Sequence, residues 1–531
     1  MSAIQTFNLA LASGADVVVN GAFHADVDDI TVTGGNPTST FTTEVLGTGV
    51  ETVNSSAFQG NILATVADDS LDTTVTFTGG ALATDKVTNV VANAATTYAL
   101  KSTGVELLDL DINAAAATTV SLAAATGVTG VSVDLGAAVA AITATVSNVT
   151  DEVITLKAAD DAGGADHTLV ASLVSATGTA DTIAFKMGSG TIDAGAKLQT
   201  NDVETVSINV DNAASLDLSL LAMTTAGKTM ALTVTGDTAM TISALDTDVN
   251  TIDASGMAVG GSVIQTGRTS TAASTYTGSD GNDTLMMKSK GDVLTGGAGT
   301  DTLDIDFTGI LGGLSIDLSS TTDQIDTMDG STNAAVQLGF MNVDAAGYTG
   351  FGASITGSKV ANVITGTASI DSISGGAGGD TITGGDGTDV LSVGTTGTAF
   401  AIANNDSFSG ITTVETIKSL ANSAAVTIAL DSTAQAAGIN KVDLSLASKA
   451  TGNSIDVDEI TTTAMTLIGS AAGVTTITGG DATDSITGGT AADVFIASTG
   501  NDVVTGANGA DDFKFTTALL AANSATTATF T

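Results

Sequence analysis

Aspartates recur every nine residues in three parts of the second half of the sequence, each after a glycine-rich stretch and two residues before an apolar residue. One unit reads Gly384-Gly385-Asp386-Gly387-Thr388-Asp389-Val390-Leu391. Glycine permits positive φ and close backbone approach, and Ca²⁺ takes about six to eight oxygens from carboxylates and turn carbonyls. The chain has no Cys and two His, so its ligand set favours Ca²⁺ over zinc or copper. The spacing predicts calcium-binding turns.

Three runs keep this nine-residue phase. The first run has its aspartates at 283, 292 and 301, and Met286–Lys290 interrupts its middle turn. The second run contains two degenerate units followed by two near-perfect ones. The third run ends in units that keep the fourth-position glycine, as Gly500 and Gly509. The candidate metal-binding residues are Gly278, Asp280, Asp283, Asp292, Gly296, Ala298, Asp301, Asn362, Asp371, Gly375, Ala377, Asp380, Gly384, Asp386, Asp389, Gly479, Asp481, Asp484, Asp493, Asp502 and Asp511.

Two nine-residue units make one coil of a parallel roll, so residues 18 apart should stack on the same side and share an ion. Residues nine apart, such as Asp380 and Asp389, should lie on opposite faces. The expected partners are Asp283 with Asp301, Asp371 with Asp389, Asp484 with Asp502, Asp493 with Asp511, and, as weaker pairs, Asn362 with Asp380 and Thr475 with Asp493. The expected core residues between the faces are Ile373, Ile382, Leu391, Ile486, Phe495, Val504 and Phe513.

The alternative is that these are metal-free glycine turns capped by aspartate. A lone unit would fit that alternative well. Consecutive units in register favour calcium in the second and third runs, and the interrupted first run is the weaker case.

The composition bounds the fold. Aromatic residues make up 3% of the chain, so a thin core of Val, Ile, Leu and Ala is easier to fill than one large globular core. Abundant Thr, Val and Ile favour strands. A valine–glutamate phrase precedes alternating apolar and polar residues at Val50-Glu51, Val105-Glu106, Val203-Glu204 and Val414-Glu415, and it indicates solenoid rungs or short strands in unrelated sheets. Short helices are possible at Asn113–Ala117 and Leu216–Ala226.

Charge and motifs exclude several function classes. The net charge is −43, and nucleic-acid binding needs basic patches that the chain lacks. Residues Met1 to Ala15 show no signal-peptide pattern, and the uncharged run Asn113–Val133 is too polar to span a membrane. No zinc-protease motif, serine-hydrolase elbow or cysteine nucleophile occurs. A paired-carboxylate glycosidase remains open, although few aromatics are present to stack sugars. We expect no enzyme.

Residues 278–304, 357–392 and 470–514 resemble the RTX calcium-binding β-roll repeats of proteins exported by type I secretion. The resemblance implies folding outside the cell on calcium binding and an uncleaved C-terminal export signal. Phe513–Leu520 resembles the entry to the C-terminal module that follows such repeats. The expected fold is all-β: an elongated, multi-layer β-solenoid with parallel β-roll blocks and few short helices.

The expected organisation alternates repeat blocks with other β structure. An irregular β-rich N-terminal region would be followed by three RTX blocks, two β-rich inserts and the start of a C-terminal module. The expected boundaries are 1–270 for the N-terminal region, 271–310, 357–393 and 470–515 for the blocks, 311–356 and 394–469 for the inserts, and 516–531 for the module.

Scattered RTX blocks, excess Ala, Thr, Gly, Asp and Val, and missing Cys also resemble the S-layer proteins of Gram-negative bacteria. This resemblance implies a location on the bacterial cell surface. Its implied partners are copies of the chain in a lattice and lipopolysaccharide, held by the N-terminal region. The alternative is an RTX adhesin or biofilm-matrix protein, although such proteins usually carry long arrays of near-identical domains.

Overall fold

A computed structural model of the protein describes most of the chain. The described residues are 5–23, 26–46, 49–66, 75–80, 82, 84–91, 97–112, 117–136, 141–159, 166–192, 194–212, 214–308, 312–394, 398–403, 408–420, 423–515 and 529–530. The chain is an all-β parallel solenoid with very little helix, as predicted. It divides into two compact units, Met1–Asp301 and Thr302–Thr531.

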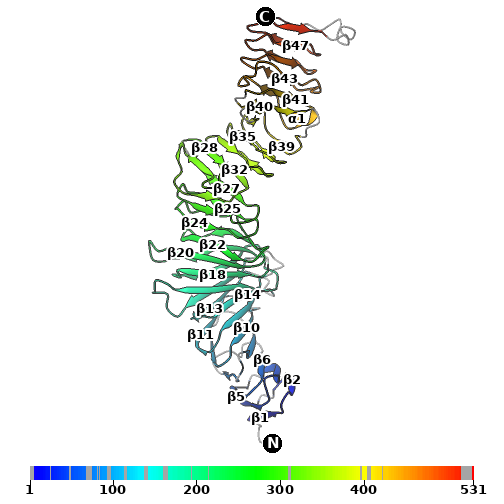
Figure 1. Cartoon of the computed structure of the whole chain (residues 1–531). Helices are drawn as coiled ribbons and strands as arrows, with labels where there is room; N and C mark the ends of the chain where they lie inside the picture. The colour runs from blue at the N-terminus through cyan, green and yellow to red at the C-terminus, as the bar shows by residue number, and fades with distance from the viewer. Residues whose placement is uncertain are drawn as a thin grey trace. The chain divides into compact units, whose positions relative to one another are not determined.

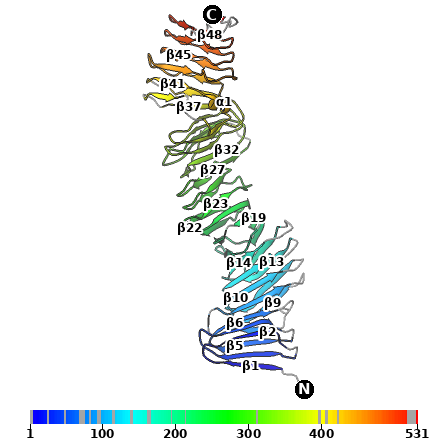
Figure 2. The same cartoon turned by 90° about the vertical axis from the view of Figure 1, so that its right-hand side faces the viewer.

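Unit 1 is built from two parallel sheets whose strands alternate along the chain, so each coil adds one strand to each sheet (Figures 1 and 2). The odd-numbered strands are β1 (Thr6–Leu11), β3 (Asp29–Gly34), β5 (Thr52–Phe58), β7 (Thr76–Thr78), β9 (Thr97–Thr103), β11 (Thr118–Thr126), β13 (Thr143–Val149), β15 (Thr168–Leu173), β17 (Ala196–Asn201), β19 (Ala214–Ala222), β21 (Ala239–Leu245), β23 (Ser262–Gln265) and β25 (Thr284–Met287). The even-numbered strands are β2 (Asp16–Ala22), β4 (Thr40–Leu46), β6 (Asn61–Val66), β8 (Lys86–Val91), β10 (Leu107–Ile112), β12 (Gly130–Asp134), β14 (Val153–Ala158), β16 (Thr182–Met187), β18 (Thr205–Val210), β20 (Met230–Gly236), β22 (Val249–Met257), β24 (Thr275–Thr277) and β26 (Val293–Thr295).

Unit 2 is built in the same way, and most of its strands are shorter. One row holds β27 (Thr302–Phe307), β32 (Asn342–Tyr348), β34 (Val363–Thr365), β36 (Thr381–Thr383) and β39 (Ile411–Thr412). A second holds β28 (Leu314–Asp317), β33 (Ala353–Thr356), β35 (Ser372–Ser374), β37 (Val390–Val393), β40 (Thr416–Ser419), β42 (Lys441–Asp443), β44 (Thr466–Ile468), β46 (Ser485–Thr487), β48 (Val503–Thr505) and β50 (Thr529–Phe530), and a third holds β38 (Phe400–Ile402), β41 (Val426–Ala429), β43 (Asn453–Asp456), β45 (Thr475–Thr478), β47 (Val494–Ile496) and β49 (Asp512–Lys514).

The remaining elements of unit 2 lie outside these three rows of parallel strands. β29 (Ile325–Met328) and β30 (Ser331–Thr332) add antiparallel to β28, and β31 (Gln337–Leu338) is a short further strand. The helix α1 (Ser432–Ala436) begins at Asp431, whose side chain accepts hydrogen bonds from the backbone N–H groups of Thr433 and Ala434.

The core lies between the sheets because side chains on a strand alternate between its two faces. In β18, Val206, Ile208 and Val210 are fully buried, and the residues between them are half-buried. Each buried Val, Leu or Ile contributes about 1.5–3 kcal/mol through apolar burial. Coil length differs along the chain: Thr205 pairs with Ala231, whereas Ile364 pairs with Ile382, 18 residues on.

The helix predicted at Leu216–Ala226 is wrong, because residues up to Ala222 belong to strand β19. Leu216 and Leu218 are fully buried on one face, and the alternation that would have indicated a strand breaks at Leu220, beside a register shift against β17. Two other sequence predictions cannot be compared, because Asn113–Ala116 and Thr516–Leu520 lie outside the described residues. The predicted domain boundaries stay a prediction.

Candidate metal-binding turns

The predicted 18-residue stacking is confirmed. In each pair, the carboxylate of the later residue accepts a hydrogen bond from the backbone N–H of the earlier one. The Oδ1···N distances are 2.8 Å for Asp301 to Asp283, 3.0 Å for Asp380 to Asn362, 2.8 Å for Asp389 to Asp371, 2.8 Å for Asp493 to Thr475, 3.0 Å for Asp502 to Asp484 and 2.9 Å for Asp511 to Asp493. Counted from the first glycine of a nine-residue unit, these aspartates occupy the sixth position. Each one ties its turn to the turn on the same side of the preceding coil.

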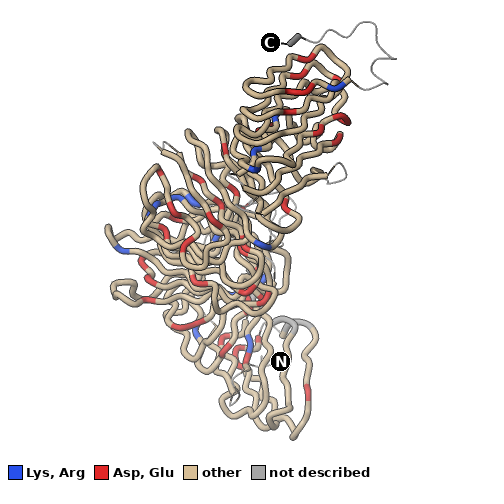
Figure 3. The backbone as a smooth tube through the Cα atoms, turned by 45° about the horizontal axis from the view of Figure 1, so that its top comes forward, with Lys and Arg blue, Asp and Glu red and all other residues tan. Residues whose placement is uncertain are grey.

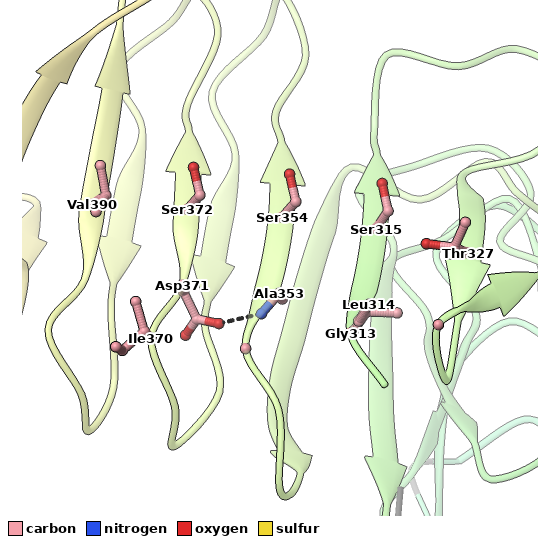
Figure 4. Close-up of a pocket in the computed structure, with 12 residues that line it drawn as sticks. Gly313, Leu314, Ser315, Thr327, Ala353, Ser354, Ile370, Asp371, Ser372 and Val390 are labelled. Atoms are coloured by element: carbon pink, nitrogen blue, oxygen red, sulfur yellow. Dashed lines mark hydrogen bonds between the residues drawn. The ribbon is translucent and has the colours of Figure 1, made fainter. Parts of the chain in front are cut away.

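Residues nine apart lie in different sheets, as predicted. β34 and β36 pair with each other in one sheet of the second run, and β35 and β37 pair in another. The predicted core residues are buried between them, except Phe513, which is half-buried and stacks on Phe495 at 5.0 Å between ring centroids. Figure 4 shows Asp371 entering β35 with its carboxylate bonded to Ala353 of β33, beside the outward-facing Ser354 and Ser372.

The second carboxylate oxygen turns back into its own turn. Asp371 Oδ2 accepts from Thr367 N at 2.7 Å, Asp484 Oδ2 from Gly480 N at 2.7 Å, and Asp493 Oδ2 from Gly489 N at 2.6 Å. A carboxylate four residues beyond an N–H thus closes the turn, which is why aspartate occupies the end of each glycine-rich stretch.

Oxygens of successive turns converge where the first glycine of a unit has no side chain. A Cβ added to Gly366 would lie 2.3 Å from Gly384 O and 2.5 Å from Asp371 Oδ2. A Cβ on Gly278 would lie 2.1 Å from Gly296 O and 2.7 Å from Asp283 Oδ2. Carbonyl and carboxylate oxygens from adjacent turns therefore share one small space, which is the donor chemistry that Ca²⁺ prefers.

The electrostatics of these turns favour a bound cation. Burial raises the pKa of Asp301 to about 7, helped by the neighbouring Asp283 carboxylate and opposed by the hydrogen bond from Asp283 N. Burial raises the pKa of Asp389 to about 6, again opposed by a backbone hydrogen bond and helped by the charges of Asp371 and Glu415. The Oδ2 atoms of Asp301 and Asp389 are buried without a hydrogen-bond partner. A calcium ion would compensate the desolvated charge.

Carbonyl oxygens must complete any such site. Across the part of the chain that the structure describes, no group of three or more His, Cys, Asp or Glu side chains is placed to hold a metal. The sixth-position aspartates would supply the charge, and turn carbonyls such as Gly384 O would supply further ligands.

The predicted residues occupy the first, third and sixth positions of their nine-residue units. The first-position glycines 278, 296, 375, 384 and 479 are buried in the stack. The third-position side chains are exposed on the outer side of their turns, and these are Asp280, Ala298, Ala377, Asp386 and Asp481. The structure brings the sixth-position carboxylates and the first-position glycines together, and it leaves the third-position side chains outside that group. Their roles as calcium ligands stay a prediction.

Asp292, one of the predicted calcium ligands, is already paired with a protein cation, and its role as a ligand stays a prediction. Arg268 Nη1 lies 2.6 Å from Asp292 Oδ2, and Arg268 Nη2 lies 3.0 Å from Asp292 Oδ1. Arg268 also donates to the carbonyl oxygens of Met286 and Ala272. The guanidinium therefore supplies the positive charge in the interrupted middle turn of the first run. Sequence reasoning missed Arg268 because it lies 24 residues before its partner, outside the repeat.

The valine–glutamate phrases are rungs of the solenoid. Val50, Val105, Val203 and Val414 are buried, and each phrase leads into a strand. In three of them the glutamate Oε2 accepts the backbone N–H of an aspartate one coil earlier: Glu106 from Asp85 at 3.1 Å, Glu204 from Asp181 at 3.1 Å and Glu415 from Asp389 at 2.7 Å. Glutamate thus makes the bond to the preceding coil that aspartate makes in the nonapeptide turns. The sequence showed the phrase but not this role.

Acidic residues outnumber basic ones along the chain (Figure 3), with 57 Asp and Glu against 14 Lys and Arg in the sequence. No curated protein sequence is significantly similar to the chain. The family model for the RTX calcium-binding nonapeptide repeat (4 copies) matches residues 277–305, 356–394 and 478–513. These segments contain the three runs of stacked aspartate turns, and repeats of this family bind calcium. The chain is therefore an RTX calcium-binding repeat protein.

Proposed function

We propose that the chain is the subunit of an S-layer, a two-dimensional coat on the outer surface of a bacterial cell that assembles when calcium is present. RTX repeats support a secreted calcium-binding protein, and no helix among the described residues is long and apolar enough to cross a membrane. The role is structural and not enzymatic.

The observation that carries the proposal is the burial of carboxylates in a chain of net charge −43. Asp283, Asp301, Asp371, Asp389, Asp484 and Asp493 are all at most 1% exposed. Calcium that binds the folded state alone stabilises it by mass action. The same ions lower the repulsion between acidic neighbours, so folding and close packing of subunits would share one trigger.

The distribution of the repeats supports a coat subunit over an adhesin or biofilm-matrix protein. The RTX segments are inserted among coils of other lengths, and the chain contains no long array of near-identical domains. In the proposed coat, copies of the chain contact one another, and the N-terminal region binds lipopolysaccharide.

Electron microscopy of the purified full chain tests the proposal. With calcium we expect ordered sheets, and with a chelator we expect none. Separate particles at saturating calcium would contradict assembly into a coat and favour the adhesin alternative. Binding to lipopolysaccharide-containing vesicles, compared with vesicles of phospholipid alone, tests the anchor separately.

A further inference from the structure

The turn after the second run departs from the nonapeptide pattern. Thr413, Val414 and Glu415 replace a six-residue turn, and they lie beyond the matched segment that ends at residue 394. Thr413 has a φ of 51°, a left-handed conformation that is uncommon for a β-branched residue. This conformation accompanies a turn in which Val414 is buried and Glu415 reaches back to Asp389.

The three-residue turn keeps the oxygen geometry of the longer ones. A Cβ added to Gly384 would lie 2.0 Å from Thr413 O and 2.6 Å from Asp389 Oδ2. The matching positions at Gly366 are taken by Gly384 O and Asp371 Oδ2. Thr413 O therefore replaces the first-glycine carbonyl, and the longer side chain of Glu415 replaces the sixth-position aspartate.

One bond differs, and it leaves a carboxylate oxygen of Asp389 without a donor. In the preceding turn, Thr367 N donates to Asp371 Oδ2 at 2.7 Å. In the Asp389 turn, the corresponding Gly385 N donates to Thr413 Oγ1 at 2.9 Å. Asp389 is 0% exposed, and its Oδ2 is buried without a partner. A buried anionic oxygen without a donor is costly unless a cation meets it.

The related turn at Glu204 shows what a cation does in such a place. Glu204 Oε1 lies 2.5 Å from Lys228 Nζ, which also donates to Gly178 O at 2.8 Å. The ammonium therefore bridges a carboxylate and a carbonyl of successive coils. Among the described residues, no Lys or Arg forms an ion pair with Asp389 or Glu415.

We propose that Asp389, Thr413 O and Glu415 form a further calcium site that closes the second run, with two of its three ligands beyond the nonapeptide repeats. Two carboxylates and a carbonyl are hard oxygen ligands suited to Ca²⁺. The inference concerns metal binding alone and does not depend on assembly into a coat.

Counting bound calcium in the full chain, by equilibrium dialysis or native mass spectrometry, tests the site. Glu415→Gln keeps an acceptor for Asp389 N but loses the charge, so we expect it to bind one ion fewer than the unmodified chain. Glu204→Gln is the matched control, and we expect no change in its ion count because Lys228 already fills that place.

An unchanged ion count and affinity in E415Q would overturn the site, as would an equal loss in E204Q. If E415Q does not fold, Thr413→Val gives an independent test without altering charge. Its lost hydroxyl frees Gly385 N to bond Asp389 Oδ2 in competition with the ion, so affinity for one ion should fall. Unchanged affinity for every ion in T413V would count against the proposal.

Discussion

Arg268 and Asp292 form an ion pair in which both side chains are buried, at 1% and 0% exposed respectively. The guanidinium also lies over the ring of Tyr276, 5.1 Å from its centroid. Asp292 Oδ1 accepts a further bond from Ser274 N, one coil earlier. This turn of the first run therefore carries its own cation, whereas Asp301 and Asp389 each leave a buried oxygen without a partner.

Replacing Arg268 with Met should destabilise unit 1 strongly. The change leaves the Asp292 carboxylate buried without its cation, a loss of about 3–5 kcal/mol in the free energy of unfolding. Denaturant unfolding in excess chelator measures the effect. Lys186→Met is the control, since the Lys186–Asp211 pair is 44% and 46% exposed and should contribute about 1 kcal/mol or less. Equal losses in both variants would contradict a special role for Arg268.

Removing calcium should open the second and third runs before the coil that Arg268 holds. Desolvated carboxylates in stacked turns repel one another when no ion lies between them. Limited proteolysis with and without chelator, followed by mass spectrometry, locates the cuts. We expect early cleavage within 356–394 and 478–513 and protection around 268–292. Cleavage that begins around Arg268, or a pattern that ignores chelator, would argue against this order.

The calcium-free protein should lose stability as pH rises from about 4 to about 7. The folded-state pKa values of Asp301, about 7, and Asp389, about 6, lie above the ordinary aspartate value of about 3.9. The folded state therefore binds more protons than the unfolded state in this window, and its stability declines with pH.

Excess calcium should reverse that trend, because the ion binds the deprotonated carboxylates. Thermal midpoints at about pH 5 and about pH 7, each measured with chelator and with calcium, check both signs. The same direction of change in the two conditions would show that these aspartates do not govern the pH dependence.

Gly385→Ala should destabilise the second run, whereas Gly379→Ala should not. Gly385 has a φ of 110°, and an added Cβ would meet Thr367 O at 2.0 Å. A non-glycine residue in such a conformation costs about 1–3 kcal/mol before the clash is counted. Gly379 has open space at its Cβ position, so its change should stay within about 0.5 kcal/mol. Calcium titrations of both variants followed by circular dichroism compare them, and similar behaviour would contradict the close-approach argument.

The nonapeptide part of the fold was predictable because its period leaves little freedom. A fixed phase of nine residues with an apolar residue two after each aspartate sets both the 18-residue stacking of Asp371 on Asp389 and the burial of Ile373 and Ile382. No insertion interrupts these turns, so counting along the sequence was enough.

Unit 1 and the cation positions were less predictable because their coils vary in length. Glu204 reaches an aspartate 23 residues earlier, and Arg268 meets an aspartate 24 residues later, so no single period aligns them. At Leu220 a register shift against β17 breaks the alternation of β19, and the strand resembles a helix in the sequence. Such pairings depend on how successive coils stack in space, which one sequence does not reveal.

Every stacked carboxylate bonds to an amide in the coil before it, so a coil is completed only when its successor is in place. The stack consequently has a direction, and its two ends are not equivalent. Cutting a run after Asp371 would expose its backbone N–H to water, whereas cutting it before Asp371 would expose its carboxylate. Coils should therefore be added and lost at different rates at the two ends of such a run.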